Sequence, residues 1–223
     1  MTAVTSVAFR CPCCGAAFHS TVCPAANTLG PTTTDFFAMS AGVQSIHHQV
    51  HTCPECGYTF QEMEDGELQE EVRGFVLDVI SPRLEGGEVS SCMKFEFLAL
   101  IDEFLGSGYY SLGMTYLQAA WACYDMGHHE SERHYRAVAV EYLREALETG
   151  DLERDILYLV PYLIAEQYRR IGDAGSAREW YDRLLGMDQG HPDRDFFEYM
   201  AVQQRDDPKE FMGEVIHEGP TIR

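Results

Sequence analysis

Four cysteines that could bind a metal ion occur in two short segments with the same pattern. Residues 11–18 (CPCCGAAF) and residues 53–60 (CPECGYTF) both read Cys-Pro-x-Cys-Gly-x-x-Phe. Two residues between the cysteines allow both sulfurs to reach one ion across a tight turn. Proline fixes the backbone after the first cysteine, and glycine after the second can adopt a positive φ. The pattern predicts one tetrahedral zinc site formed by Cys11, Cys14, Cys53 and Cys56, with each phenylalanine packed beneath its turn.

A site made of four cysteines is closed to water and substrate. Its predicted role is therefore structural, because zinc would stabilise a segment that is too short to bury a large core. Iron in a rubredoxin-like site is the alternative metal, since thiolate ligands do not exclude it. Four ordinary buried cysteines would also be possible, but the close match of the two segments argues against this interpretation.

The remaining cysteines are interpreted by their surroundings. The side chain of Cys13 should point away from the metal, which predicts a partly exposed thiol, and Cys23 is expected to be packed. A second metal site formed by Cys23 with His19 or His51 stays open, because the ligand types suit a metal. Two further cysteines lie among apolar residues of predicted helices and are expected in the core: Cys92 and Cys123.

The charge of the chain is unevenly distributed. The 223 residues carry a formal net charge of −20, yet residues 1–60 contain only Arg10, Asp35 and Glu55 as charged side chains apart from histidine. Nucleic-acid binding requires clustered Lys and Arg, so we expect no nucleic acid at the zinc module. The acidic remainder favours a partner with basic segments. Without a long apolar run or a signal-like start, we expect a cytoplasmic protein that does not contact a membrane, in which paired cysteines indicate metal rather than disulfides.

Small β-structures would have to bring the two cysteine segments together. Residues 19–35 are rich in Thr, Pro, Asn and Gly and predict a loop. Residues 43–52 alternate in character and predict a strand with Ile46, His48 and Val50 on one face. Together these features predict a zinc-ribbon-like module over residues 1–66, ending at Asp65-Gly66.

The rest of the chain shows helical spacing, so the predicted fold class is mainly α. Apolar stripes over 68–80 and 97–105 predict connecting helices within residues 67–108. Residues 109–223 predict a domain of antiparallel helices joined by short turns that contain glycine. The predicted spans of these helices are 109–126, 131–148, 153–171, 174–186 and 193–205.

The helical half follows the residue order of tetratricopeptide repeats, in which small and aromatic residues interlock two helices. One pair of helices matches this order well, at Ala165, Tyr168, Ala177, Tyr181 and Leu184. An earlier pair matches more loosely, at Tyr109, Leu112, Gly113, Tyr116, Ala139, Leu143 and Ala146. A generic helical bundle is the alternative interpretation.

Taken together, the chain resembles an uncharacterised, mainly bacterial family known as domain of unknown function 2225. The similarity lies in the order of the two cysteine segments, an Asp35-Phe36 pair between them, and a helical half that contains Ala119-Ala120-Trp121. The chain departs from the family pattern at Thr32-Thr33-Thr34, where the family has an arginine-rich and acidic sequence. The resemblance implies zinc and a helical scaffold, and no established activity.

From these observations we expect a non-enzymatic, zinc-binding scaffold or adaptor whose helical repeats bind a protein or peptide. The alternative is a thiol-based redox or zinc-release sensor in which Cys13 reacts beside the metal, since zinc-bound thiolates are nucleophilic. A metallohydrolase would need an open metal position. His129 and His134 do not supply one, because they are five residues apart and a zinc-protease helix places its histidines four apart.

Overall fold

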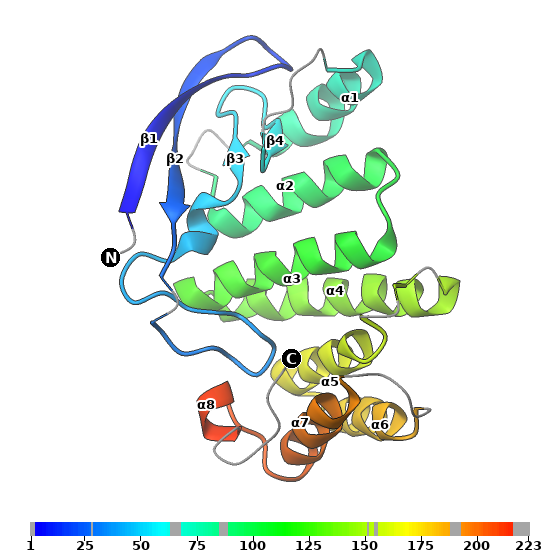
Figure 1. The fold of residues 1–223 in the computed structure, drawn as a ribbon. Coiled ribbons are helices and arrows are strands. Elements are labelled where there is room, and N and C mark those ends of the chain that lie inside the picture. The colour runs from blue at the N-terminus through cyan, green and yellow to red at the C-terminus, as the bar shows by residue number, and fades with distance from the viewer. Residues whose placement is uncertain are drawn as a thin grey trace.

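The fold is given by a computed structural model that describes residues 3–27, 29–62, 68–84, 89–150, 152–153, 156–187 and 193–215. It is mainly helical, with small strands at the N-terminal end (Figure 1). Within these described residues no helix is long and apolar enough to cross a membrane. The predicted boundary at Asp65-Gly66 lies outside the described residues, and the division into 1–66, 67–108 and 109–223 stays a prediction.

Two antiparallel hairpins each enclose one cysteine segment. Strand β1 (Ala3–Arg10) pairs with β2 (Ala17–Ala25), and Phe9 lies opposite Phe18. Strand β3 (His51–Thr52) pairs with β4 (Thr59–Phe60). Because each cysteine segment forms the end of a hairpin, the two cysteine-containing turns can approach each other.

Two local predictions for this region were wrong. The expected strand over 43–52 is present only at its end, where His51–Thr52 form β3, whereas Ser45–His48 form a 3₁₀ helix that buries Ile46. The expected loop over 19–35 begins with strand β2, whose polar residues are ordered by pairing with β1. The pairing of β2 with β1 cannot be predicted from the composition of residues 19–35 alone.

The helical half closely follows the predicted spans. Helix α1 (Glu70–Phe75) continues into a π-helical turn (Val76–Ile80) and a 3₁₀ turn (Ser81–Arg83). The following helices are α2 (Ser91–Phe104), α3 (Tyr109–Met126), α4 (His129–Thr149), α5 (Leu159–Ile171), α6 (Ala174–Leu185), α7 (Arg194–Asp206) and α8 (Met212–Val215). The expected helix over 153–171 begins only at Leu159, which places Pro161 in its first turn, where a missing N–H is tolerated.

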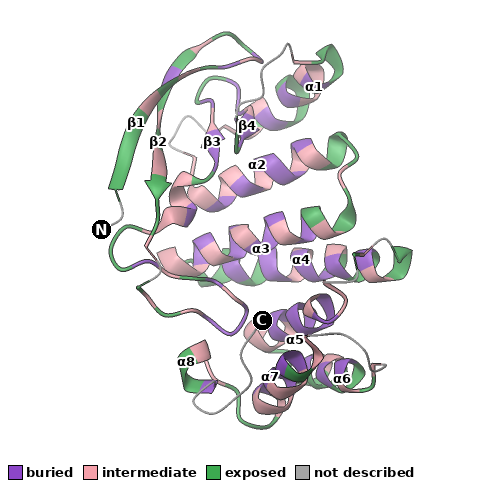
Figure 2. Cartoon of the chain, in the orientation of Figure 1, coloured by how far each residue is buried: buried purple, intermediate pink, exposed green. Residues whose placement is uncertain are grey.

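Consecutive long helices pack as antiparallel neighbours (Figure 1). The α3–α4 pair is especially close at Gly113, where an added Cβ would lie 2.9 Å from Cγ and Cδ2 of Leu143. The core falls into three clusters. The first surrounds the cysteines and includes α1 and α2, the second is formed by helices α2 to α5, and the third by helices α5 to α8. Figure 2 shows the buried faces of α2 to α5 turned toward one another. The cysteine-containing N-terminal part and the helical half therefore both pack on α2.

Candidate metal centre and buried ion-pair cluster

Both cysteine segments fold into the same hydrogen-bonded turn. In the first, the N–H of Gly15 donates to the carbonyl of Cys11 at 2.9 Å, and the N–H of Cys11 donates to the carbonyl of Ala16 at 2.9 Å. In the second, the N–H groups of Gly57 and Cys53 make the equivalent bonds, also at 2.9 Å. Both glycines have a φ of 77°, a conformation that a side chain would strain. The glycines therefore play the part that their position in the sequence predicts.

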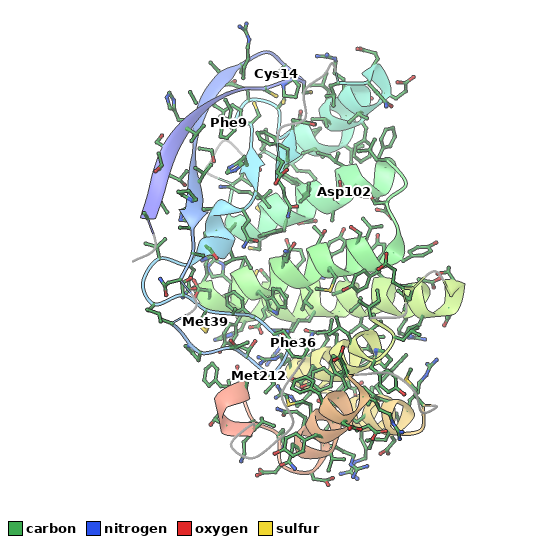
Figure 3. The ribbon with its side chains drawn as sticks, viewed as in Figure 1. Phe9, Cys14, Phe36, Met39, Asp102 and Met212 are labelled. Atoms are coloured by element: carbon green, nitrogen blue, oxygen red, sulfur yellow. The ribbon has the colours of Figure 1, made fainter. Side chains whose placement is uncertain are left out.

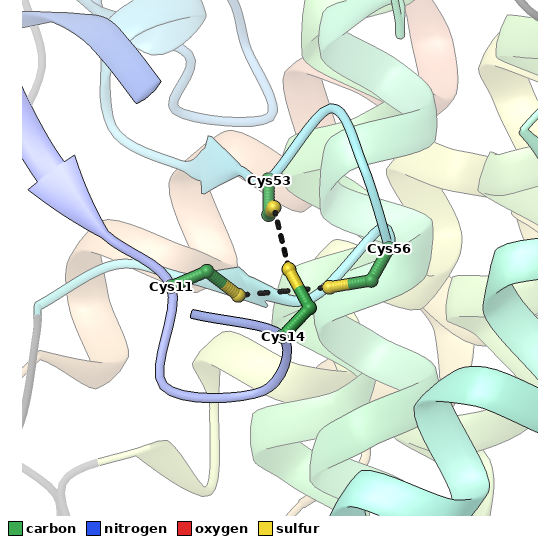
Figure 4. Close-up of side chains that lie close together, drawn as sticks. All are labelled: Cys11, Cys14, Cys53 and Cys56. Atoms are coloured by element: carbon green, nitrogen blue, oxygen red, sulfur yellow. Dashed lines mark hydrogen bonds between the residues drawn. The ribbon is translucent and has the colours of Figure 1, made fainter. Parts of the chain in front are cut away.

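The four predicted ligands lie together (Figure 4). The Sγ atom of Cys11 is 3.6 Å from that of Cys56, and the Sγ atom of Cys14 is 3.6 Å from that of Cys53. All four sulfurs lie within 4.8 Å of one another. A metal ion about 2.3 Å from four sulfurs at the corners of a tetrahedron would separate them by about 3.8 Å. The observed spacing fits such an ion, which would join the two turns.

The sulfurs hold their protons with unequal strength. The hydrogen bond with Cys56 lowers the pKa of Cys11, and the same bond raises the pKa of Cys56. Two backbone amides of its own turn also point at the sulfur of Cys11, and the equivalent amides point at that of Cys53. Burial nevertheless raises the pKa of Cys53 to about 11. A divalent cation would replace the shared protons and offset the cost of gathering four thiolates.

The metal centre is built into a core that includes α1 and α2. Phe18 and Phe60 are both buried beneath the turns, as predicted, with ring centroids 6.5 Å apart. Ile80 packs so closely on the second turn that a Cβ added to Gly57 would lie 2.7 Å from Cγ2 of Ile80. Arg73 of α1 donates a hydrogen bond to the carbonyl of Cys13. An ion at this centre would therefore position helices as well as strands.

The other cysteines are placed differently from one another. Cys13 is 2% exposed, so the expectation of a partly exposed thiol was wrong: its side chain lies in the core beside the four sulfurs, within reach of the thiol of Cys56. Cys23 is half-buried, and its Sγ donates to the carbonyl of Ala25. Among the described residues, the four predicted ligands form the only group of Cys, His, Asp or Glu side chains arranged to hold a metal, so Cys23 is not joined with His19 or His51. The two expected core cysteines are buried: Cys92 and Cys123.

A second polar cluster, centred on the fully buried Asp35 and Arg136, lies against α3, α4 and α5. Oδ2 of Asp35 accepts from Nη1 of Arg136 at 2.7 Å and from Nε1 of Trp121 at 2.8 Å. Oδ1 accepts from Oγ1 of Thr33 at 2.6 Å and lies 3.1 Å from Nε of Arg170. Burial by itself would raise the pKa of Asp35, but the two guanidinium groups outweigh it and hold that pKa well below its usual range. Asp35 is therefore an ionised carboxylate in the core.

Glu166 extends this ion-pair cluster toward α6. Its side chain is fully buried, and its Oε2 accepts from Oγ1 of Thr34 at 2.6 Å and from Nη2 of Arg169 at 2.8 Å. Oε1 accepts a hydrogen bond from the hydroxyl of Tyr181. Burial, together with the charge of Glu166, raises the pKa of Tyr181, which therefore keeps its proton. The cluster thus joins one segment of the N-terminal part to four helices, α3 to α6.

The segment that carries Asp35, residues 31–39, is here named the docked segment. Its chain reverses at Phe36, which has a φ of 70°. The N–H of Thr33 donates to the carbonyl of Phe37 at 3.0 Å and closes this reversal. The turn directs Asp35 toward the guanidinium groups, while the ring of Phe36 lies 5.5 Å from that of Tyr162.

The docked segment also contacts the C-terminal part of the chain. The N–H of Met212 donates to the carbonyl of Thr32 at 2.8 Å, and the N–H of Thr34 donates to the carbonyl of Glu210 at 3.1 Å. Figure 3 shows Phe36 and Met212 near each other, with the α2–α4 layer between them and Cys14. The chain therefore fills this face of its own helical array.

Nothing in the sequence pattern singled out the arginines of this cluster. Arg136 and Glu166 occur in amphipathic helices, where a charged residue ordinarily faces water. A usable signal was available in their spacing: each lies among residues of the apolar stripe rather than opposite it, as at Tyr135, Ala139 and Ala165. A charge in that position indicates either a buried partner or a functional site.

Comparison with known proteins agrees with the resemblance noted in the sequence. The model of one protein family, described as "Uncharacterized protein conserved in bacteria (DUF2225)", matches residues 5–207. No curated protein and no solved structure matches the chain. Since the matched residues include both cysteine segments, the docked segment and helices α1 to α7, the chain belongs to this bacterial family of domain of unknown function 2225.

Proposed function

We propose that the protein is a zinc-stabilised scaffold: one Zn²⁺ holds the N-terminal hairpins together, and the helical half binds a protein partner. The observation that carries this proposal is the set of four sulfurs with tetrahedral spacing, three of them buried in a core shared with α1 and α2. Zn²⁺ suits four thiolates and is redox-inactive, and a closed site of this kind supplies folding energy.

The proposal extends to the helical half, which we interpret as tetratricopeptide-like. Support comes from the α5–α6 pair, where the small and aromatic residues of the repeat pattern are buried at the interface: Ala165, Ala177, Tyr181 and Leu184. The close approach of α3 and α4 at Gly113 adds support, because such arrays require small residues where helices interlock. Paired helices of this kind present extended surfaces to other proteins.

The metal part of the proposal is tested by the metal content of the purified chain. We expect one zinc per wild-type chain and none in Cys53→Ser, because that change removes a buried ligand. The matched control is Cys23→Ser, whose half-buried thiol lies outside the four-sulfur group and which should keep one zinc. Iron in the wild-type protein, or zinc retained by Cys53→Ser, would contradict the proposal.

The scaffold part is tested by recovery of a partner from a lysate of the source cells at low salt. We expect wild-type protein and Cys23→Ser to retain the same partner and Cys53→Ser to lose it, since the helices near the metal depend on the zinc-bound core. Recovery of no partner by the wild-type protein would count against a scaffold.

The sensor hypothesis receives no comparable support. A reactive thiol must be accessible and must ionise readily. Cys13 is 2% exposed, and burial raises the pKa of its thiol. The scaffold therefore stays the leading proposal, and the redox alternative depends on the opening of this core.

A further inference from the structure

One edge of the helical half carries two adjoining hollows that share the ring of Tyr109. The first has a volume of about 440 Å³ and lies between the start of α3 and the C-terminal half of α4. The second, of about 460 Å³, continues past the α2–α3 turn toward Glu103 and Leu152. Each has the size of an ordinary ligand pocket. Together they form a groove at one end of the α2–α4 layer, here named the acidic aromatic groove.

One wall of this groove is acidic. Glu141, Glu145 and Glu148 line the first hollow, and their spacing of four and three residues places them on one face of α4. All three are exposed, and no ion pair among the described residues uses their carboxylates. Arg144 is the only cation lining either hollow within the described residues, while Glu103 adds a carboxylate to the second. The groove therefore has an excess of unpaired negative charge.

The floor and rim of the groove are aromatic and apolar. Tyr109 is 44% exposed, and its ring lies 6.5 Å from that of Tyr142. Tyr142 is held by a stacked contact with Tyr116 and by a hydrogen bond from its hydroxyl to Glu103 at 2.8 Å. The second hollow adds apolar side chains to the lining: Leu112, Ala146 and Leu152. Tyrosine faces beside carboxylates complement a cation that has an apolar stem, as in Lys and Arg side chains.

We propose that the acidic aromatic groove is the docking surface for a partner-protein segment that contains Lys or Arg together with leucine-like residues. This inference rests on the proposed scaffold function and names the chemistry of its partner. The cations would lie on the tyrosine faces near the carboxylates, and the apolar residues would enter the second hollow, which Tyr110 and Leu152 help to line. A small polyamine would neutralise the carboxylates but supply no apolar side chain to the second hollow, which favours a protein segment.

The test uses the zinc-loaded full chain and a fluorescein-labelled peptide of eight residues in which lysine and leucine alternate. Binding is measured by fluorescence anisotropy at low and at high salt. We expect Tyr109→Ser and the double variant Glu141→Gln with Glu145→Gln each to weaken binding at least about fivefold. A charge-matched control, Glu71→Gln with Glu179→Gln, changes two exposed acids outside the groove and should bind within about twofold of wild type.

The outcomes are distinct. Equal losses in the groove variant and the charge-matched control would overturn the proposal, because they would indicate attraction to the net charge alone. Unchanged binding by Tyr109→Ser, failure of the wild-type chain to bind the peptide, or competition by spermidine as effective as that of unlabelled peptide would also overturn it. None of these results affects the zinc content or the partner recovery that judge the scaffold itself. Circular dichroism of each variant confirms that its helices are intact.

Discussion

Replacing Asp35 by Asn should strongly destabilise the protein without changing the size of the side chain. The carboxylate is fully buried. It accepts hydrogen bonds from Arg136, Trp121 and Thr33 and forms an ion pair with Arg170. Asn lacks the charge, and its NH₂ group must face at least one of these donors. Loss of one partner from a buried ion pair costs about 3–5 kcal/mol, because the remaining charge is uncompensated.

The assay is urea denaturation followed by tryptophan fluorescence. Trp121 donates directly to Asp35, so its emission reports the ion-pair cluster itself. With a urea m value of about 2–3 kcal/mol/M, the expected loss lowers the denaturation midpoint by roughly 1–2.5 M. Metal content should not change, since Asp35 lies on the far side of the α2–α4 layer from the cysteines.

The matched control is Asp207→Asn. Asp207 pairs with Lys209 at 2.7 Å, but the two side chains are 72% and 38% exposed. Such a surface pair contributes about 0–1 kcal/mol. If Asp35→Asn were as mild as this control, the buried cluster would not hold the docked segment in place, and the reasoning would be refuted.

Three further predictions concern the same fold. The difference in unfolding free energy between wild type and Asp35→Asn should narrow as the pH falls below about 4. The pKa of Asp35 is depressed in the folded state, so the stability that its carboxylate contributes is present above the unfolded pKa and is lost on protonation. Urea titrations at several pH values check this, and a constant difference would contradict it. Gly113→Ala should destabilise the protein by about 1–3 kcal/mol, because the added Cβ would contact Leu143. The control Gly74→Ala, with no atom within 4 Å of the added Cβ, should be neutral or mildly stabilising in the same assay. Equal effects would disprove close packing between α3 and α4. Tyr181→Phe should cost about 1–3 kcal/mol by removing a donor to buried Glu166, and a thermal-unfolding midpoint equal to wild type would show that this bond contributes nothing.

The four-cysteine cluster was predictable because the signals for it are local in the sequence. Two residues between cysteines, a proline and a glycine define one turn, and each turn needs nothing from the rest of the chain to present its sulfurs. The structure places Cys11, Cys14, Cys53 and Cys56 together as predicted. The helices of the second half were equally readable, since apolar spacing and glycine stops are also local signals.

Strand pairing and side-chain burial were harder to predict from the sequence. Strand β2 depends on its partner β1, so its own polar composition indicated a loop. Cys13 was expected near the surface because its neighbours in sequence are ligands, but the fold places α1 over it. The apolar side chains of Ile46 and Val50 indicated a buried face, and both are buried. Their spacing did not indicate that a 3₁₀ helix would form at Ser45–His48.

By itself the sequence determined the four-cysteine site, the helical character of the remainder and the membership in a family, all of which rest on residues close together or on their order. Only the tertiary structure decided that Asp35 crosses to meet Arg136, 101 residues away, and that the docked segment fills a face of the helical array. It also decided that Tyr109 and Glu141 share a groove. These contacts join distant parts of the chain. In the sequence, a charged residue that is buried with a partner cannot be distinguished from one that faces water.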